Sequence, residues 1–232
     1  MDGEPNPVTG SPVRPLVTLP AWLAGLVNAV PDWVIAGTFL VTWIRPSALG
    51  EGMVGRLLLV MMVEFIVVHS SAFMGSVAMS PSKRGQRLTG LLVLGAFYSL
   101  FTGAISLGFH ASWPFWSFWA LTANRMLGVL ISPATDLREA GVVVAGWASA
   151  VGAYIAAVFV TIVLPMPRLG VSRDVVASLH LRGSGLWIDQ PWRLLAAGTL
   201  YFLLVGISDL FLARKAAGRS PLQGAATPRT AT

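Results

Sequence analysis

Glu64 stands near the middle of the apolar run LLLVMMVEFIVVHSSAFMG, far from either end. A charged side chain at the centre of a membrane helix costs free energy, so it persists where it faces the interior of a helix bundle. At 100° per residue, Ser71 and Gly75 lie about 20° to either side of Glu64 on a helix. The three residues predict a polar stripe that meets another helix or a water-filled path. A working acid and a purely structural hydrogen bond are equally open for Glu64.

Arg125 lies in the run WALTANRMLGVLIS, just past the centre of another apolar stretch. Its guanidinium does not lose its proton, so it must reach the membrane surface or pair with a carboxylate. Asp32 and Glu64 are the candidate partners, and Asn124 adds a polar side chain beside it. We expect a structural ion pair, with an anion site on Arg125 as the alternative.

Asp32 follows Pro31, which removes a backbone hydrogen bond and frees carbonyl groups. Transporters build ion sites at such broken helices, but usually in two matching halves, and a second break is missing here. Asp209 lies near the end of the last apolar run, close to Arg214 and Lys215. We predict that Asp209 is interfacial and structural.

His69 follows Glu64 by five residues, a turn of about 140°, so the two do not share a helix face. The spacing is neither the i, i+3 nor the i, i+4 of a helical metal site, and the chain has three His and no Cys. We predict no metal site and prefer a helix-bonding role for His69 over a proton relay. No GxSxG, HExxH, Walker or dinucleotide motif is present, so the sequence favours a protein that is not an enzyme and identifies no catalytic residue and no cofactor.

Six apolar runs are long enough to cross the ~30 Å hydrocarbon core, which takes about 20 helical residues. They cover approximately residues 20–44, 54–79, 88–109, 113–131, 141–164 and 192–212. The predicted fold class is all-α, a polytopic transmembrane helical bundle of about six spans. We expect a disordered tail over residues 1–15, the membrane domain over 16–214, and a disordered cytoplasmic tail over 215–232.

The first run contains Pro31 and has two interpretations. It could be an interfacial helix followed by a span, or one kinked span. The segment from Asp32 to Ile44 would measure only about 20 Å at 1.5 Å per residue, which is too short to cross. We therefore predict a single kinked span.

Composition supports a membrane location. Of the 232 residues, 55% are hydrophobic and 11% are charged, whereas a soluble domain has about 25% charged residues. The net charge of +6 comes mostly from loops and tails, where the positive-inside rule explains it, so we predict a bilayer and no nucleic acid as partner. The basic loop SPSKRGQR and the basic C-terminal segment place both termini in the cytoplasm, and we expect a bacterial inner membrane.

Three further features carry predictions. Aromatic residues crowd the start of the fourth run, and we read them as an interfacial belt rather than a ligand pocket. In the long connection after the fifth run, residues 172–181 could form a short helix capped by Ser172, lying on the membrane surface or acting as a lid. Ala148, Gly152 and Ala156 form a small-residue face that favours close packing. We prefer packing within the chain and keep a homo- or hetero-oligomer contact as the alternative.

The sequence leads to three function hypotheses. The first is a small transporter, channel or proton-coupled permease, with an ion or substrate pathway formed by Asp32, Glu64, His69, Asn124 and Arg125. The second is a membrane-embedded enzyme acting on a lipid or quinone, and the third is a non-catalytic partner subunit.

Overall fold

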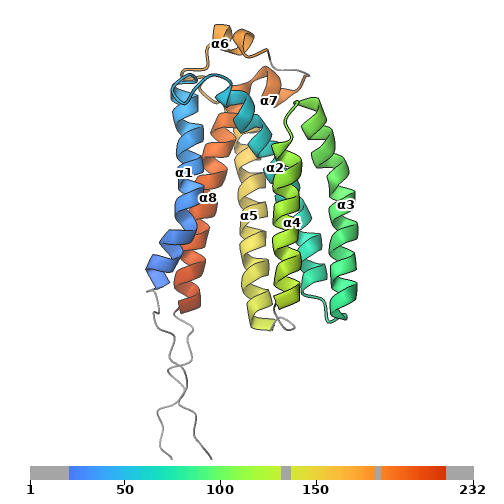
Figure 1. The fold of residues 1–232 in the computed structure, drawn as a ribbon. Helices are drawn as coiled ribbons and strands as arrows, with labels where there is room; N and C mark the ends of the chain where they lie inside the picture. The colour runs from blue at the N-terminus through green and yellow to red at the C-terminus, as the bar shows by residue number, and fades with distance from the viewer. Residues whose placement is uncertain (1–20, 132–136, 181–183, 218–232) are drawn as a thin grey trace, which may run out of the picture.

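A computed structural model of the protein describes residues 21–131, 137–180 and 184–217. These residues form an all-α bundle without strands, as predicted. The helices, shown in Figure 1, are α1 (Ala21–Ile44), α2 (Met53–Ala78), α3 (Arg84–Gly108), α4 (Trp113–Ile131), α5 (Leu137–Val163), α6 (Arg173–Ser178), α7 (Leu186–Asp189) and α8 (Pro191–Ala217). The tail predicted over 1–15 lies outside the described residues. Helix α8 extends to Ala217, past the predicted domain boundary at residue 214.

Five helices are long and apolar enough to cross a membrane, namely α1, α2, α3, α5 and α8. The chain is therefore a multi-pass membrane protein. The sixth predicted span, α4, is a helix of 19 residues, about 28 Å long at 1.5 Å per residue. Its tryptophans, Asn124 and Arg125 lower its hydropathy, so it is not among the five. That α4 crosses the membrane remains a prediction.

Helix α1 is one continuous helix from Ala21 to Ile44 with Pro31 inside it. The prediction of one helix rather than two is confirmed. Figure 1 shows α1 bending in its lower part, near its start. Proline explains a bend because it removes one intrahelical hydrogen bond and crowds the preceding turn.

The connections agree with the sequence in part. Helix α6 begins after Ser172, whose side chain accepts a hydrogen bond from the Val175 amide at 3.3 Å, as predicted. Helix α7 was not predicted, because four residues hold no recognisable period. Helix α3 begins at Arg84, one turn before the predicted start at residue 88, so Arg87 belongs to a helix and not to a loop.

Helices α1 and α8 pack most closely. A Cβ atom added at Gly198 of α8 would lie 2.3 Å from two ring atoms of Phe39 on α1. At Gly206, two turns further along α8, it would lie 2.5 Å from the Trp33 indole nitrogen. Only glycine allows this approach of the two helices, and Phe39 is fully buried as a result.

Helix α2 joins two separate cores. Its first half contributes Leu58 and Met61 to a core shared with α1, α5 and α8. Its second half contributes Ile66 and Met74 to a core shared with α3 and α4. In the residues that the structure describes, helices α4 and α5 do not pack closely against each other. The two halves of the bundle therefore diverge along the second half of α2.

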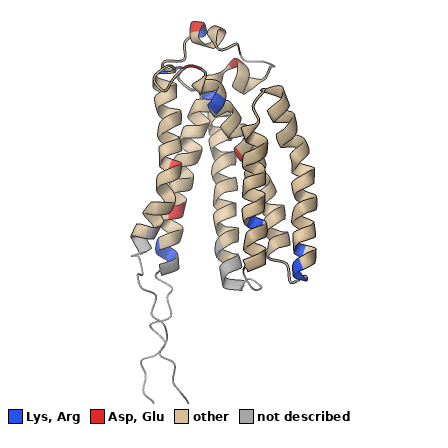
Figure 2. Ribbon diagram, in the orientation of Figure 1, with Lys and Arg blue, Asp and Glu red and all other residues tan. Residues whose placement is uncertain are grey.

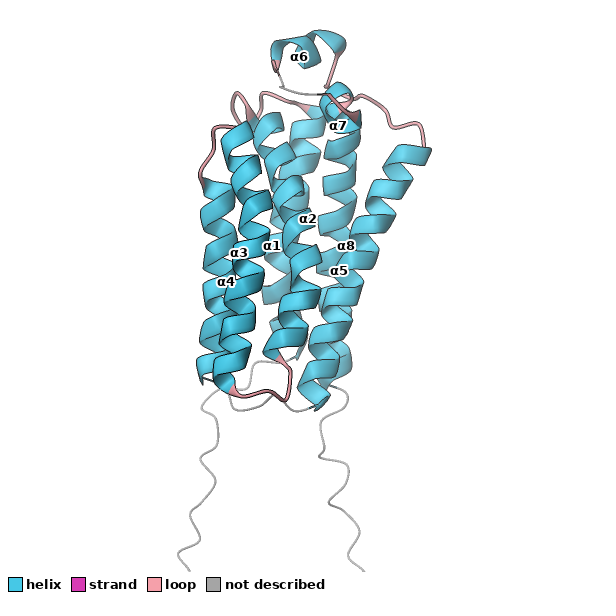
Figure 3. Ribbon diagram, turned by 90° about the vertical axis from the view of Figure 1, so that its right-hand side faces the viewer, coloured by secondary structure: helices cyan, strands magenta, loops and turns pink. Residues whose placement is uncertain are grey.

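The bundle has two distinct ends. Helix α1 begins and α8 ends at the same end, whereas α6 and α7 lie at the other (Figures 1 and 3). We call the first the terminal end. Figure 2 shows that the helices carry few charges along their length and that the basic residues of α3 lie at the terminal end. The few charged residues that lie between the two ends are the candidates for a functional site.

Candidate functional site

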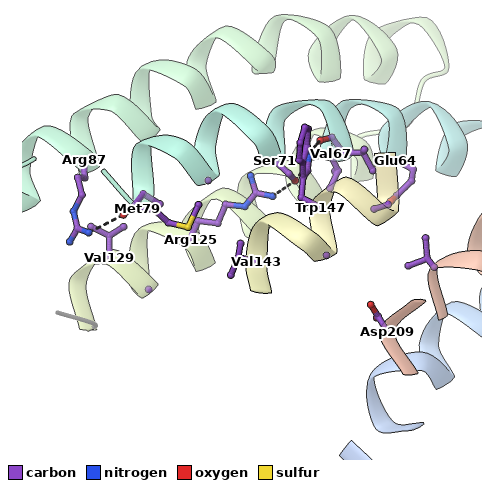
Figure 4. A pocket seen from close by; sticks show the side chains of 17 residues that line it. Glu64, Val67, Ser71, Met79, Arg87, Arg125, Val129, Val143, Trp147 and Asp209 are labelled. Carbon is purple, nitrogen blue, oxygen red and sulfur yellow. Dashed lines mark hydrogen bonds between the residues drawn. The ribbon is translucent and has the colours of Figure 1, made fainter. Parts of the chain in front are cut away.

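A cavity of about 600 Å³ lies between α2, α4, α5 and α8, where the two cores diverge (Figure 4). Five ionisable or hydroxyl side chains line it, from three helices of the bundle and the first turn of α3. They are Glu64, Ser71, Arg87, Arg125 and Asp209. Apart from Trp147, the rest of the lining is aliphatic, Met or Gly. We call this space the central cavity.

Glu64, Ser71 and Gly75 all line the central cavity, as the predicted stripe on α2 requires. Glu64 lies at its inner end, and the Tyr201 hydroxyl donates a hydrogen bond of 2.5 Å to its Oε1 atom. Tyr201 belongs to α8, so this bond links α2 to α8 across the bundle. Glu64 is thus held by one donor, and in the described part of the chain its second carboxylate oxygen accepts no hydrogen bond.

Arg125 reaches from α4 toward α2 in the middle of the central cavity (Figure 4). Its Nη2 donates to the Ser71 hydroxyl at 2.5 Å and its Nη1 contacts the Met74 sulfur at 3.2 Å. Among the side chains that the structure describes, which leave out that of Glu139, no carboxylate pairs with it. The expected ion pair with Asp32 or Glu64 is not formed, because Glu64 bonds Tyr201 instead. The Ser71 hydroxyl and the Met74 thioether are both neutral, so they do not compensate the positive charge of Arg125.

Two aspartates lie on the opposite side of the bundle. Asp209 of α8 lines the central cavity and is half-buried, so the sequence placed it too far toward the interface. Asp32 of α1 is also half-buried and lies within electrostatic range of Asp209 and Glu64. It does not line the central cavity. The two aspartates thus belong to α1 and α8, whereas the guanidinium groups of Arg87 and Arg125 belong to α3 and α4.

His69 points away from Glu64, as the 140° turn predicts. It lines a second, largely apolar groove of about 290 Å³ between α2 and α5. Its ring stacks on Phe65, with centroids 5.9 Å apart, and meets Phe73 and Tyr98 at 5.6 and 6.1 Å. The structure therefore does not bring His69 together with Glu64 and Arg125.

Asn124 is exposed on α4 and does not line the central cavity. Of the aromatic residues that begin α4, Phe118 is buried in the core shared with α3, whereas Trp116 is 65% exposed. A tryptophan whose side chain is exposed near a helix end is typical of the aromatic belt at a membrane–water interface. Asn124, Phe118 and Trp116 all belong to α4, and none of them lines the central cavity.

The small-residue face of α5 is not covered by this chain. Ala148, Gly152 and Ala156 are all exposed, and a Cβ atom added at Gly152 would meet nothing within 4 Å. The preference for packing within the chain is wrong, because α5 turns Ala153 and Ala157 inward instead. An oligomer contact through the exposed face stays a prediction.

Aromatic residues pack next to Glu64, at the inner end of the central cavity. Tyr154 of α5 donates to the Met61 carbonyl at 3.2 Å, and its ring meets that of Tyr201 edge-on at 5.3 Å. The ring centroids of Tyr201 and Phe202 are 4.8 Å apart, and the Phe202 ring stacks on that of Phe39. Beyond Glu64 the bundle is therefore a packed core. The central cavity extends the other way, to Met79 and Arg87 at the terminal end.

Sequence reasoning missed several residues of the site. Arg87 was counted as a loop cation, whereas it is buried with an exposed fraction of 6%. Tyr201 and Trp147 were not singled out, although each hydrogen-bonds α2, Trp147 through the Val68 carbonyl at 2.9 Å. The available signal was a tyrosine and a tryptophan in the middle of apolar helices, where a polar atom needs a partner.

The fold and the site define a class: a multi-pass α-helical membrane protein with a charged cavity inside the bundle. No group of three His, Cys, Asp or Glu residues that could hold a metal ion occurs in the described residues. No family model, no curated protein and no solved structure matches the chain. The function must therefore be inferred from the cavity.

Proposed function

We propose that the protein is a small transporter that moves an anion together with a proton through the central cavity. The observation that carries the proposal is the guanidinium of Arg125, which has no carboxylate partner among the described side chains and faces a cavity of about 600 Å³. An arginine in the membrane keeps its charge, and leaving that charge uncompensated costs free energy. A bound anion supplies the missing partner.

In this pathway Glu64 is the residue that binds and carries the proton. An anion held at Arg125 must pass Glu64 to cross the bundle, and a carboxylate would repel it. Protonation of Glu64 removes the repulsion, so the anion and the proton would cross together. The hydrogen bond from Tyr201 holds the Glu64 side chain at the inner end, where this exchange would occur.

The one-sided shape of the central cavity supports a transporter more than an open channel. It extends from Glu64 toward Met79 and Arg87 at the terminal end. Tyr201, which bonds Glu64, packs against the rings of Tyr154 and Phe202 and does not line the cavity. A site closed on one side is what alternating access requires. With both termini in the cytoplasm, the cavity would face inward.

The test uses purified protein in phosphatidylcholine vesicles loaded with a pH-sensitive dye. Gradients of phosphate, sulfate, succinate and glutamate are imposed in turn, and proton movement is recorded. We expect at least one anion to drive saturable proton influx, reduced about 30-fold or more in Arg125→Gln, as for loss of one partner of a buried charged contact. Asn124→Ala, which alters the exposed neighbour, should transport normally. Equal influx in wild type and Arg125→Gln with every anion would sink the proposal.

The second candidate is a membrane-embedded enzyme acting on a lipid or quinone, and the groove beside His69 favours it. This groove lies between α2 and α5 and is lined by Phe65, Phe73 and Tyr154 as well as His69. An imidazole among aromatic rings could bind a flat head group. No serine, threonine, lysine or carboxylate is among its lining residues. The groove therefore favours binding of such a ligand over its chemical conversion.

A further inference from the structure

Arg87, in the first turn of α3, lines the end of the central cavity opposite Glu64. Its Nη1 donates to the Ala78 carbonyl at 2.9 Å, near the C-terminus of α2. Its Nε is buried and has no hydrogen-bond partner in the part of the chain that the structure describes. Capping of α2 explains the first contact, because cations favour the carbonyl end of a helix. It does not explain why a second donor is buried without a partner.

Arg87, Arg125 and Glu64 are placed at regular intervals along α2. Arg87 bonds Ala78, Arg125 bonds Ser71, and Glu64 is itself on α2. These three α2 positions are seven residues apart, so they lie on nearly the same face in steps of about 10 Å. Figure 4 shows Arg87, Arg125 and Glu64 in this order along the cavity.

We propose that Arg87 is a second anion site, at the mouth of the central cavity, that binds a carboxylate or phosphate group before the group reaches Arg125. The inference rests on the proposed function and adds a first step to it. The planar guanidinium suits these groups, since its donors match two oxygens of one anion. A gap of about 10 Å is too long for one such group to bridge, so the two sites are occupied in turn. The aliphatic lining between them, with Met79 and Val129, favours an organic anion.

The chain has no cysteine, which makes a single introduced thiol a clean probe. Gly128 lines the cavity, and a Cβ atom added there would meet nothing within 4 Å. Gly128→Cys is treated with two thiosulfonate reagents of similar size, one bearing a sulfonate and the other a trimethylammonium group. We expect the anionic reagent to react faster, because two arginines line this part of the cavity.

Arg87→Gln in the Gly128→Cys protein should lower the ratio of anionic to cationic rates about threefold or more, the effect of one nearby unit charge in a wet cavity. Arg87→Lys keeps the charge and should keep the ratio. An unchanged ratio in Arg87→Gln would show that Arg87 only caps α2, and the proposal would fail.

Protection by a bound anion tests the site directly. Inorganic phosphate should slow modification of Gly128→Cys, and Arg87→Lys should weaken this protection about threefold or more, because a lysine lacks the planar fork. This measurement also serves if Arg87→Gln does not fold. Protection by phosphatidylglycerol in phosphatidylcholine vesicles, without protection by phosphate, would identify a lipid phosphate as the bound group. Protection by neither, or equal protection in Arg87→Lys, overturns the proposal.

The two proposals fail in different ways. If Gly128→Cys reacts with neither reagent, the cavity holds no water and the transport proposal fails as well. If Gly128→Cys reacts but substitution of Arg87 changes neither the rate ratio nor the protection, only the proposal of an anion site at Arg87 fails.

Discussion

At the scale of single residues, the chemistry of this protein depends on which polar groups have partners. Glu64 is held by Tyr201 at 2.5 Å, whereas Arg125 contacts only a hydroxyl and a thioether in the described residues. The carboxyl group of Glu64 and the guanidinium of Arg125 therefore line one cavity without forming an ion pair. That arrangement leaves Arg125 free for an anion and Glu64 free for a proton.

Glu64→Gln tests the proton-carrying role. Glutamine keeps an oxygen that can accept from Tyr201, so thermal unfolding in detergent should change little. Anion-driven proton influx should be lost, because the amide cannot carry a proton across. Undiminished influx in this variant would contradict the role, whatever its stability.

Tyr201→Phe tests the contact that holds Glu64. Removing the hydroxyl leaves a buried acceptor without its donor, which costs about 1–3 kcal/mol. We expect lower thermal stability in detergent. In a Glu64→Leu background the same change should cost far less, since the acceptor is gone, and equal costs in both backgrounds would mean that the bond contributes nothing.

At the scale of elements, helix packing decides where the cavity lies. The glycines of α8 let α1 approach closely, with Phe39 filling the space beside Gly198. Helix α2 is shared by two cores, and in the described residues α4 and α5 do not pack closely against each other. The cavity is therefore a consequence of how two groups of helices share one partner.

Gly198→Ala tests this close approach. The added methyl would lie 2.3 Å from the Phe39 ring, and overpacking of this kind costs about 1–3 kcal/mol. Thermal unfolding in detergent should show the loss. Gly103→Ala on α3, where nothing lies within 4 Å, is the matched control and should be neutral or slightly stabilising. Similar melting temperatures for the two variants would argue against the α1–α8 contact.

The elements were predictable from sequence because each depends on local information. Apolar runs of sufficient length fix the helices, and Ser172 fixes the start of α6. The partners were not predictable. Nothing in the run around Glu64 indicates Tyr201, which is 137 residues away, and nothing around Arg87 shows that α3 buries it. Helical phase placed Glu64 and His69 on different faces, but it could not say what each face meets.

At the scale of the whole molecule, the bundle is asymmetric along its length. The central cavity begins at Glu64, next to the packed rings of Tyr154 and Tyr201, and reaches toward the end where α1 begins and α8 ends. The exposed small-residue face of α5, with Ala148 and Gly152, lies outside this cavity. Transport and any association with a second protein would thus use different surfaces of α5.

The central claim, that water fills the cavity between α2, α4, α5 and α8, is tested most directly by two single-cysteine variants of α5. Gly146 lines the cavity and Gly152 faces outward, and neither position crowds an added Cβ atom. Thiosulfonates react with the thiolate, which forms in water and not in hydrocarbon. We predict that a membrane-impermeant reagent modifies Gly146→Cys from the terminal side and leaves Gly152→Cys unmodified. Gly146→Cys as inert as Gly152→Cys would contradict the account.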